Sequence, residues 1–165
     1  MSVKVTLEVL NKPNLMQSLS WLCTQKMPAK AAWNISRLSK QINKEIQGAR
    51  EFYIEKMKSF VELDEKGNIK PNVVSNEGEA KMYGLAIGQP IDGSYIVKEN
   101  AEEEFKTWNM EYMKTEVVIE SYKIHMDDLG SVELAPHVIN DLEDFIMTRE
   151  EALEQIQQDN VVPIK

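Results

Sequence analysis

The chain has 165 residues, of which 42% are hydrophobic and 28% charged, and its formal net charge is −8. These values are typical of one folded globular domain and exclude a disordered chain. Because no apolar run reaches about 18 residues, we expect no membrane span, and the start of the chain does not predict a signal peptide. The single Cys23 excludes an internal disulfide and fits a reducing cytoplasm.

The first predicted elements are a strand and a short helix. Apolar and polar residues alternate over residues 2–9, which predicts a half-buried β-strand. A polar segment then breaks the strand, and Asn14 is suited to cap a short helix. Cys23 lies on the apolar face of that helix, where a free cysteine is expected as a small core residue.

The most informative segment is a long amphipathic helix predicted over residues 30–63. Pro28 suits the start of this helix, and the turn at residues 64–68 ends it. Gly48 lies midway and predicts close contact with another helix, either the later helix of this chain or that of a second copy. The apolar residues recur at about 3.6 residues, the period of an α-helix: they are Ala31, Ile35, Leu38, Ile42, Ile46, Ala49, Tyr53, Met57 and Phe60.

The second half of the chain alternates helices and strands. Asn100 is expected to cap another substantial helix, Pro136 lies early in a third, and Thr148 with Glu151 forms a possible capping box for a last one. Strands are predicted where short runs are rich in β-branched and aromatic residues. The predicted helices are 79–85, 100–113, 136–147 and 149–158, and the predicted strands are 95–98 and 115–124.

These elements predict an α+β fold that is mostly helical. Helices 30–63 and 100–113 would form a long antiparallel hairpin. A small β-sheet at one end of the hairpin would combine strands 2–9, 95–98 and 115–124. We further expect residues 1–147 to form a single α+β domain and residues 148–165 to form an acidic C-terminal helix and tail.

No motif indicates catalysis, a cofactor or a metal. His125 beside Asp127 and Asp128 could bind a metal or move protons, but no second His or Cys stands at ligand spacing. The segment 64–68 partly matches a calcium loop, yet Lys66 occupies a position that needs an oxygen ligand. We therefore predict a protein that is not an enzyme, with no catalytic, cofactor-binding or metal-binding residue.

Charge is distributed unevenly along the chain. Residues 1–63 carry ten Lys and Arg against five Glu, whereas residues 64–165 carry nine against 22 Asp and Glu. The two halves could complement each other or present opposite charges to different partners. Basic residues on the polar face of the long helix would suit an acidic partner or a nucleic acid; they are Lys30, Arg37, Lys40 and Lys44. Because the pI is near 4.9, we expect protein partners and no nucleic acid.

The acidic C-terminal half is the predicted site of the main partner contact. Many like charges lie close together there, and their mutual repulsion disfavours folding. We therefore expect these charges to serve in binding a partner. An apolar tip at the end of the chain could anchor on a neighbour, and the glycine of the long helix could contact a second copy. The predicted partner-binding residues are Glu150, Glu151, Glu154, Val161, Val162, Ile164 and Gly48.

Part of the chain resembles a family of small uncharacterised proteins encoded by tailed bacteriophages. The resemblance is carried by the first strand, the segment LNKPNL (10–15), the two helices that follow and the DEKGN turn (64–68). It covers residues 1–70 and, more loosely, 99–146, whereas residues 71–98 depart from it. It implies no activity, only a phage protein made in the cytoplasm of a bacterial host.

With this setting we expect a non-enzymatic protein that acts by protein–protein contact. The first expectation is a structural or assembly component of the virion, working as an oligomer or docked on another virion protein. The alternative is an acidic binder or inhibitor directed at a host protein, whose carboxylates mimic a nucleic acid.

Overall fold

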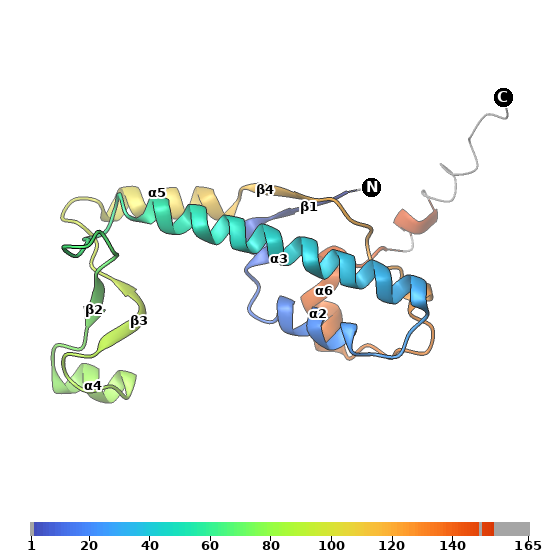
Figure 1. Cartoon of the computed structure of the whole chain (residues 1–165), viewed down its shortest axis with the longest axis horizontal. Coiled ribbons are helices and arrows are strands. Elements are labelled where there is room, and N and C mark those ends of the chain that lie inside the picture. Colours follow the sequence, from blue (N-terminus) through green and yellow to red (C-terminus); the bar gives the residue numbers. More distant parts are fainter. Residues whose placement is uncertain (1, 149, 154–165) are drawn as a thin grey trace, which may run out of the picture. The chain divides into compact units, whose positions relative to one another are not determined.

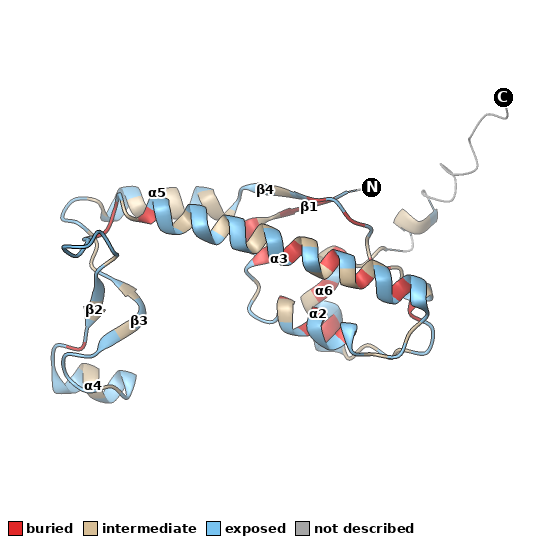
Figure 2. Ribbon diagram, viewed as in Figure 1, coloured by how far each residue is buried: buried red, intermediate tan, exposed pale blue. Residues whose placement is uncertain are grey.

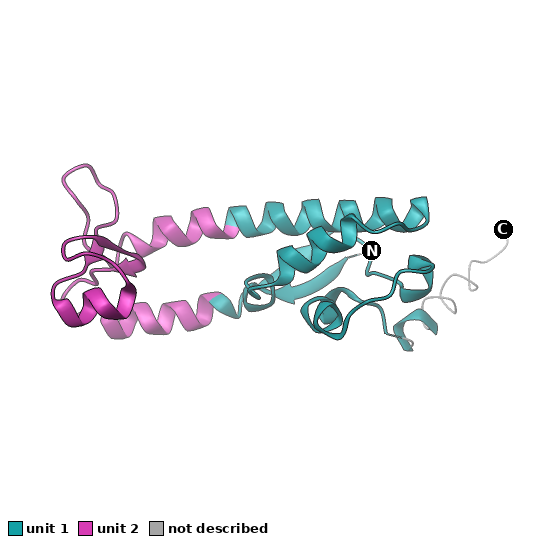
Figure 3. Cartoon of the chain, turned by 90° about the horizontal axis from the view of Figure 1, so that it is seen from below, with its two compact units in different colours: residues 1–48, 113–165 teal, residues 49–112 magenta. Residues whose placement is uncertain are grey.

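A computed structural model describes residues 2–148 and 150–153 of the chain (Figure 1). The chain forms two compact units, which are coloured separately in Figure 3. Unit 1 consists of Met1–Gly48 and Met113–Lys165, and unit 2 of Ala49–Tyr112. The residues 1–147 that were expected to form one domain are thus divided between the two units.

The described elements are mostly helical and include two small antiparallel sheets, which confirms the α+β class. In unit 1, strand β1 (Val3–Thr6) pairs with β4 (Glu116–Ile119). The strand predicted over residues 2–9 ends early, because α1 (Leu7–Leu10) follows at once. Leu7 and Leu10 are both buried, and a three-residue spacing places them on one side of a helical turn.

The core of unit 1 lies between helices. α2 (Leu15–Cys23) contacts α6 (Pro136–Leu142), and the first part of α3 (Ala29–Met57) also belongs to this unit. The predicted stripe of α3 is confirmed at Ile35, Leu38 and Ile42, which are buried, whereas Ile46 is half-buried. Other fully buried residues of this core are Leu15, Leu19, Leu22, Ile119, Leu129, Leu142 and Phe145.

Two predictions for unit 1 are wrong. Cys23 is exposed at the end of α2 and is not a core residue. The helix predicted over 136–147 ends at Leu142, followed by the 3₁₀ turn η2 (Glu143–Phe145). The chain then leaves the helix because Ile146 forms a parallel bridge with Ile124. A second 3₁₀ turn, η1 (Met126–Leu129), precedes α6.

Unit 2 contains its own sheet, in which β2 (Pro71–Val73) pairs with β3 (Pro90–Tyr95). Of the strand predicted at 95–98, only Tyr95 lies in β3, and Val97 instead forms an isolated bridge with Val61. Neither pairs with β1 or β4, so the expected three-stranded sheet is wrong. Helix α4 (Glu77–Tyr83) lies between β2 and β3 in the sequence. α3 ends at Met57, before the predicted residue 63, because the segment that follows pairs with the backbone near Val97.

In unit 2, the second part of α3 together with Phe60, which follows the end of α3, contacts α5 (Glu102–Met113) through aromatic rings. The neighbouring centroids lie 5.2–5.7 Å apart between these two segments, a distance typical of stabilising aromatic pairs. The rings are Phe52, Tyr53, Phe60, Phe105, Trp108 and Tyr112. The long antiparallel hairpin predicted for helices 30–63 and 100–113 is therefore not confirmed. The aromatic contacts join only residues 52–60 to residues 105–112.

Two turns of unit 2 show how local chemistry ends an element. Asp64 accepts hydrogen bonds from the backbone N–H groups of Lys66 and Asn68, both at 2.8 Å, and closes the predicted turn. The hydrogen bonds from Asn68 are the main reason why the pKa of Asp64 is lowered.

Asn100 is not the cap that the sequence predicts. It adopts a φ of 70°, and Ala101 instead accepts the first helical hydrogen bond of α5.

Candidate functional site

The predicted acidic contact site is only partly exposed. Glu150 is exposed, but the carboxylate of Glu151 is engaged within unit 1. Its Oε2 accepts a hydrogen bond from the backbone N–H of Thr148 at 2.8 Å, and its own N–H donates to the Thr148 hydroxyl. This reciprocal pair confirms the predicted capping box. Lys123 donates to Oε1 at 2.7 Å, and this hydrogen bond is the first cause of the lowered pKa of Glu151.

Other carboxylates of the acidic half also have partners inside unit 1. The ammonium group of Lys12 lies 2.9 Å from Glu143 and 2.7 Å from Asp144. Burial lowers the pKa of Lys12, but the hydrogen bonds to Asp144 and Glu143 outweigh it and raise the pKa overall. Ser18 donates a hydrogen bond to Asp141. The two ends of the chain thus complement each other in charge within unit 1.

The remaining predicted contact residues divide into two groups. Glu154, Val161, Val162 and Ile164 lie outside the described residues. Gly48 is exposed on α3, and a Cβ added there would meet no atom of the described chain within 4 Å. No other helix of the described chain therefore lies close to Gly48 itself. Tyr112 of α5 donates a hydrogen bond to the backbone carbonyl of the next residue, Ala49, at 2.6 Å. A role of Gly48 in binding a partner or a second copy stays a prediction.

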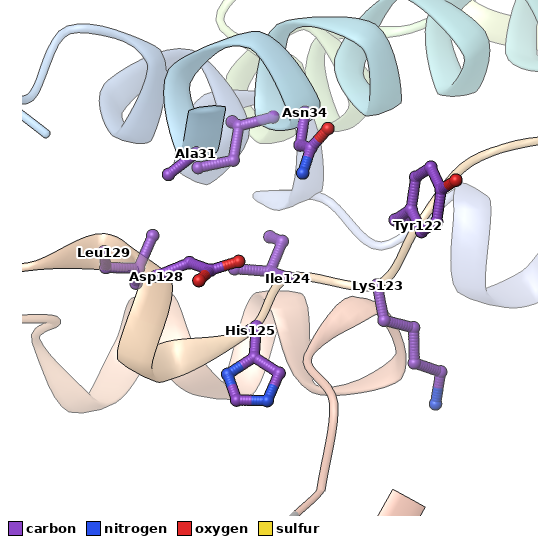
Figure 4. Close-up of a pocket in the computed structure, with 9 residues that line it drawn as sticks. Ala31, Asn34, Tyr122, Lys123, Ile124, His125, Asp128 and Leu129 are labelled. Carbon is purple, nitrogen blue, oxygen red and sulfur yellow. The ribbon is translucent and has the colours of Figure 1, made fainter. Parts of the chain in front are cut away.

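His125 lines a small pocket in unit 1 (Figure 4). The pocket is about 20 Å³, room for about one water molecule. Figure 4 shows the imidazole pointing away from Ala31 and Asn34, and its Nδ1 lies 3.9 Å from Asp127. Asp128 lies 3.8 Å from Lys30 instead. Within the described residues no three His, Cys, Asp or Glu side chains gather into a metal-binding group.

A basic face of α3 is exposed in unit 1. Its cations lie on the side of the helix away from the core, as the sequence predicts, and Trp33 lies among them with 61% of its surface exposed. The exposure of Trp33 was not predicted. The signal for it is its position three residues after Lys30 and four before Arg37, which places it on the same face of the helix as these cations. The exposed cations of this face are Lys30, Arg37, Lys40 and Lys44.

Apolar side chains are exposed in unit 2, within residues 71–98, the segment that departs from the resemblance. Met82 is 78% exposed at the end of α4, and Tyr83 and Ile87 are also exposed. We call these three residues the α4 surface. Helix α4 contributes no buried residue to unit 2, and Figure 2 shows the helix in the colours of exposed and intermediate residues. Nothing in the apolar periodicity predicted this surface, because seven helical residues are too few to show a stripe.

Local hydrogen bonds hold the segment that carries the α4 surface. The side chain of Asn76 caps α4 by accepting from the N–H of Glu79 at 3.0 Å. The carboxylate of Glu79 accepts in return from the backbone N–H of Ser75 at 2.8 Å. At the base of the segment, Val74 exchanges backbone hydrogen bonds with Gly88 and Gln89 at 2.7 and 2.9 Å. The backbone is therefore ordered although its apolar side chains are exposed.

The chain matches no protein-family model, no curated protein and no solved structure. None of the helices described here has the length and apolar character needed to cross a membrane. The exposed surfaces of the two units must therefore be interpreted from their own chemistry.

Proposed function

We propose that the protein acts by binding another protein through the α4 surface. The observation that carries this proposal is the exposure of Met82, Tyr83 and Ile87 on a segment with an ordered backbone. These three large apolar side chains lie within six residues of the chain, and clustered exposed apolar residues are typical of protein-binding sites. Methionine and tyrosine suit this role because one adapts its shape and the other combines an apolar ring with a hydroxyl.

The shortness of α4 supports the same proposal. Isolated helices shorter than about 12 residues are marginal in water, and α4 has seven residues and no buried side chain. A partner that covers the α4 surface would supply the apolar burial that unit 2 does not. Each large side chain buried in this way would contribute about 1.5–3 kcal/mol before the costs of association.

A structural or assembly role in a phage particle is the setting we propose for this contact. That setting rests on the resemblance of residues 1–70 and 99–146 alone, and it would place the protein in the cytoplasm of an infected bacterium or in the virion. The alternative of an acidic host-directed binder has less support. Several of the carboxylates it would use contact Lys12 and Lys123 of the same unit.

The proposal is tested with the full chain carrying Met82→Ser and Ile87→Ser. The wild type and the variant would be captured from infected bacteria and from purified particles, and the proteins that accompany them compared by quantitative mass spectrometry. We expect the variant to lose the partner that accompanies the wild type while keeping its melting temperature. Ile139→Ser is the control, since Ile139 is an exposed apolar residue of unit 1. The proposal would be contradicted if the wild type, the double variant and the Ile139→Ser control captured the same amount of the partner.

A further inference from the structure

Five exposed side chains form a straight line on the first part of α3. They follow one another at intervals of three, four, three and four residues, the spacing of a heptad seam. The buried stripe of the same helix lies on roughly the opposite side, because each residue turns an α-helix by about 100°. We call this line the basic stripe; it consists of Lys30, Trp33, Arg37, Lys40 and Lys44.

The cations of the basic stripe have few partners of their own. Within residues 2–148 and 150–153, no carboxylate forms an ion pair with Arg37, Lys40 or Lys44. Lys30 has one long contact, 3.8 Å to Asp128, and its side chain is 79% exposed. Exposed pairs of this kind contribute little, so the positive charge of the stripe is largely uncompensated.

The placement of these cations on α3 is unfavourable for the helix itself. Lys40 and Lys44 are four residues apart, a spacing at which like charges destabilise a helix. The first turn of α3 contains Lys30 and no acidic residue. The positive end of the helix dipole disfavours a cation there. An anionic group bound along the stripe would relieve both effects.

Trp33 adds an apolar anchor to the basic stripe. The guanidinium carbon of Arg37 lies 5.6 Å from the centre of the Trp33 ring, within the range of a cation–π contact. This contact orients both side chains on the exposed side of α3. Tryptophan and arginine are the residues most often found at energetically important positions of protein interfaces.

We propose that the basic stripe is a docking surface for an acidic amphipathic helix of a partner protein. A helix lying along α3 would meet all five positions over about 21 Å, because a heptad seam follows the helix axis. Its carboxylates would face Arg37, Lys40 and Lys44, and one apolar side chain would lie against Trp33. The α4 surface takes no part in this contact, so the inference does not rest on the proposed function.

Charge decides against two other occupants. A second copy that used its own stripe across a twofold axis would bring lysines and arginines together, and like charges across an interface are costly. A nucleic acid would meet a chain of net charge −8, and unit 1 itself carries eleven Lys and Arg against fourteen Asp and Glu. Binding of a phosphate backbone depends on a positive field that such a chain lacks at longer range.

The test uses the full chain and a labelled synthetic helix of about 28 residues, four heptads, with Glu and one Leu along a single seam. A second peptide carries Gln in place of each Glu, and a duplex oligonucleotide of the same length in Å serves as the phosphate probe. Fluorescence anisotropy would measure binding from about 50 to 200 mM salt. Lys40→Glu is compared with Lys114→Glu, which makes the same charge change at an exposed residue of unit 1 outside the stripe.

We expect the Glu peptide to bind the wild type and the Gln peptide to bind at least about tenfold more weakly. Lys40→Glu should weaken binding about tenfold, with a smaller effect at high salt, whereas Lys114→Glu and Met82→Ser should leave it nearly unchanged. Trp33→Ala should weaken binding at every salt concentration, because its contact is apolar. Lys40→Gln provides a milder variant, and thermal melting of each variant confirms the fold.

Three results would overturn the proposal. Equal affinity for the Glu and Gln peptides would remove the role of the carboxylates. If Lys40→Glu and Lys114→Glu lowered the affinity for the Glu peptide equally, binding would depend on the net charge of the chain and not on a defined site. Tighter binding of the duplex than of the Glu peptide, lost in Lys40→Glu, would assign the stripe to a nucleic acid.

Discussion

The ammonium nitrogen of Lys123 lies 2.7 Å from a carboxylate oxygen of Glu151. The other oxygen of the same carboxylate accepts from Thr148 and so completes the helix cap. One acidic side chain thus satisfies a cap and an ion pair inside unit 1. Charge clusters in the sequence therefore do not identify partner contacts by themselves, because the number of charges says nothing about which of them are already paired.

The first prediction concerns the pH dependence of this cap. The pKa of Glu151 lies below its usual value of 4.5 in the folded chain, so its stabilisation is present above that pH and is lost as the pH falls through the lowered pKa. Glu151→Gln should speed hydrogen exchange of the Ala152 amide, which bonds to Thr148, by up to about fivefold at neutral pH. The side chain of Glu151 is 42% exposed, which limits the effect to about 1 kcal/mol.

The exchange rates of wild type and Glu151→Gln should converge as the pH falls below the lowered pKa of Glu151, because both side chains are then uncharged. Glu150→Gln is the matched control, because it removes the same charge from an exposed neighbour. A difference that persists unchanged at low pH would show that the carboxylate charge of Glu151 does not stabilise the cap.

The second prediction concerns the core of unit 1. Leu38 is fully buried on α3, and Leu38→Ala should lower the free energy of unfolding by about 2–5 kcal/mol through the cavity it leaves. Chemical denaturation followed by circular dichroism would measure the change. Lys40→Ala on the exposed side of the same helix should change stability by less than about 0.5 kcal/mol. A loss below about 1 kcal/mol in Leu38→Ala would mean that this side of α3 is not core.

The third prediction compares two phenylalanines of unit 2. Phe60 is 4% exposed and its ring pairs with those of Phe105 and Trp108, whereas Phe52 is 58% exposed and its ring pairs with that of Tyr112. Phe60→Ala should cost about 3–5 kcal/mol. Phe52→Ala removes the same atoms and should cost about 1 kcal/mol, the value of one aromatic pair. Chemical denaturation followed by circular dichroism would measure both losses of stability, and equal losses would contradict the burial seen here.

The fourth prediction concerns Gly48. Because an added Cβ meets no atom of the described chain within 4 Å, Gly48→Ala should raise stability by about 0.5–1 kcal/mol through helix propensity. Thermal melting would measure this gain, and sedimentation would show whether the mass in solution changes. A variant that melts lower, or that dissociates from a larger species, would instead place Gly48 at an interface between copies.

Features that depend on residues close in the sequence could be predicted. The apolar period of about 3.6 residues indicated α3 and its buried residues Ile35, Leu38 and Ile42. The capping box of Thr148 and Glu151 was predicted from residue types three positions apart, and the turn at 64–68 from its polar residues and glycine. In each case the interacting groups are neighbours, so the local sequence fixes the geometry.

Features that depend on pairing between distant residues were decided only by the tertiary structure. Bridges between Val61 and Val97 and between Ile124 and Ile146 ended two helices earlier than their apolar pattern predicted. The backbone hydrogen bonds that join two strands are the same for almost every residue type, and the side-chain contacts that select a partner lie between residues distant in the sequence. The pairing of β3 with β2 could therefore not be predicted. The exposure of Trp33 and Met82 likewise depends on which elements cover them, and sequence periodicity identifies a helix face without naming its neighbour.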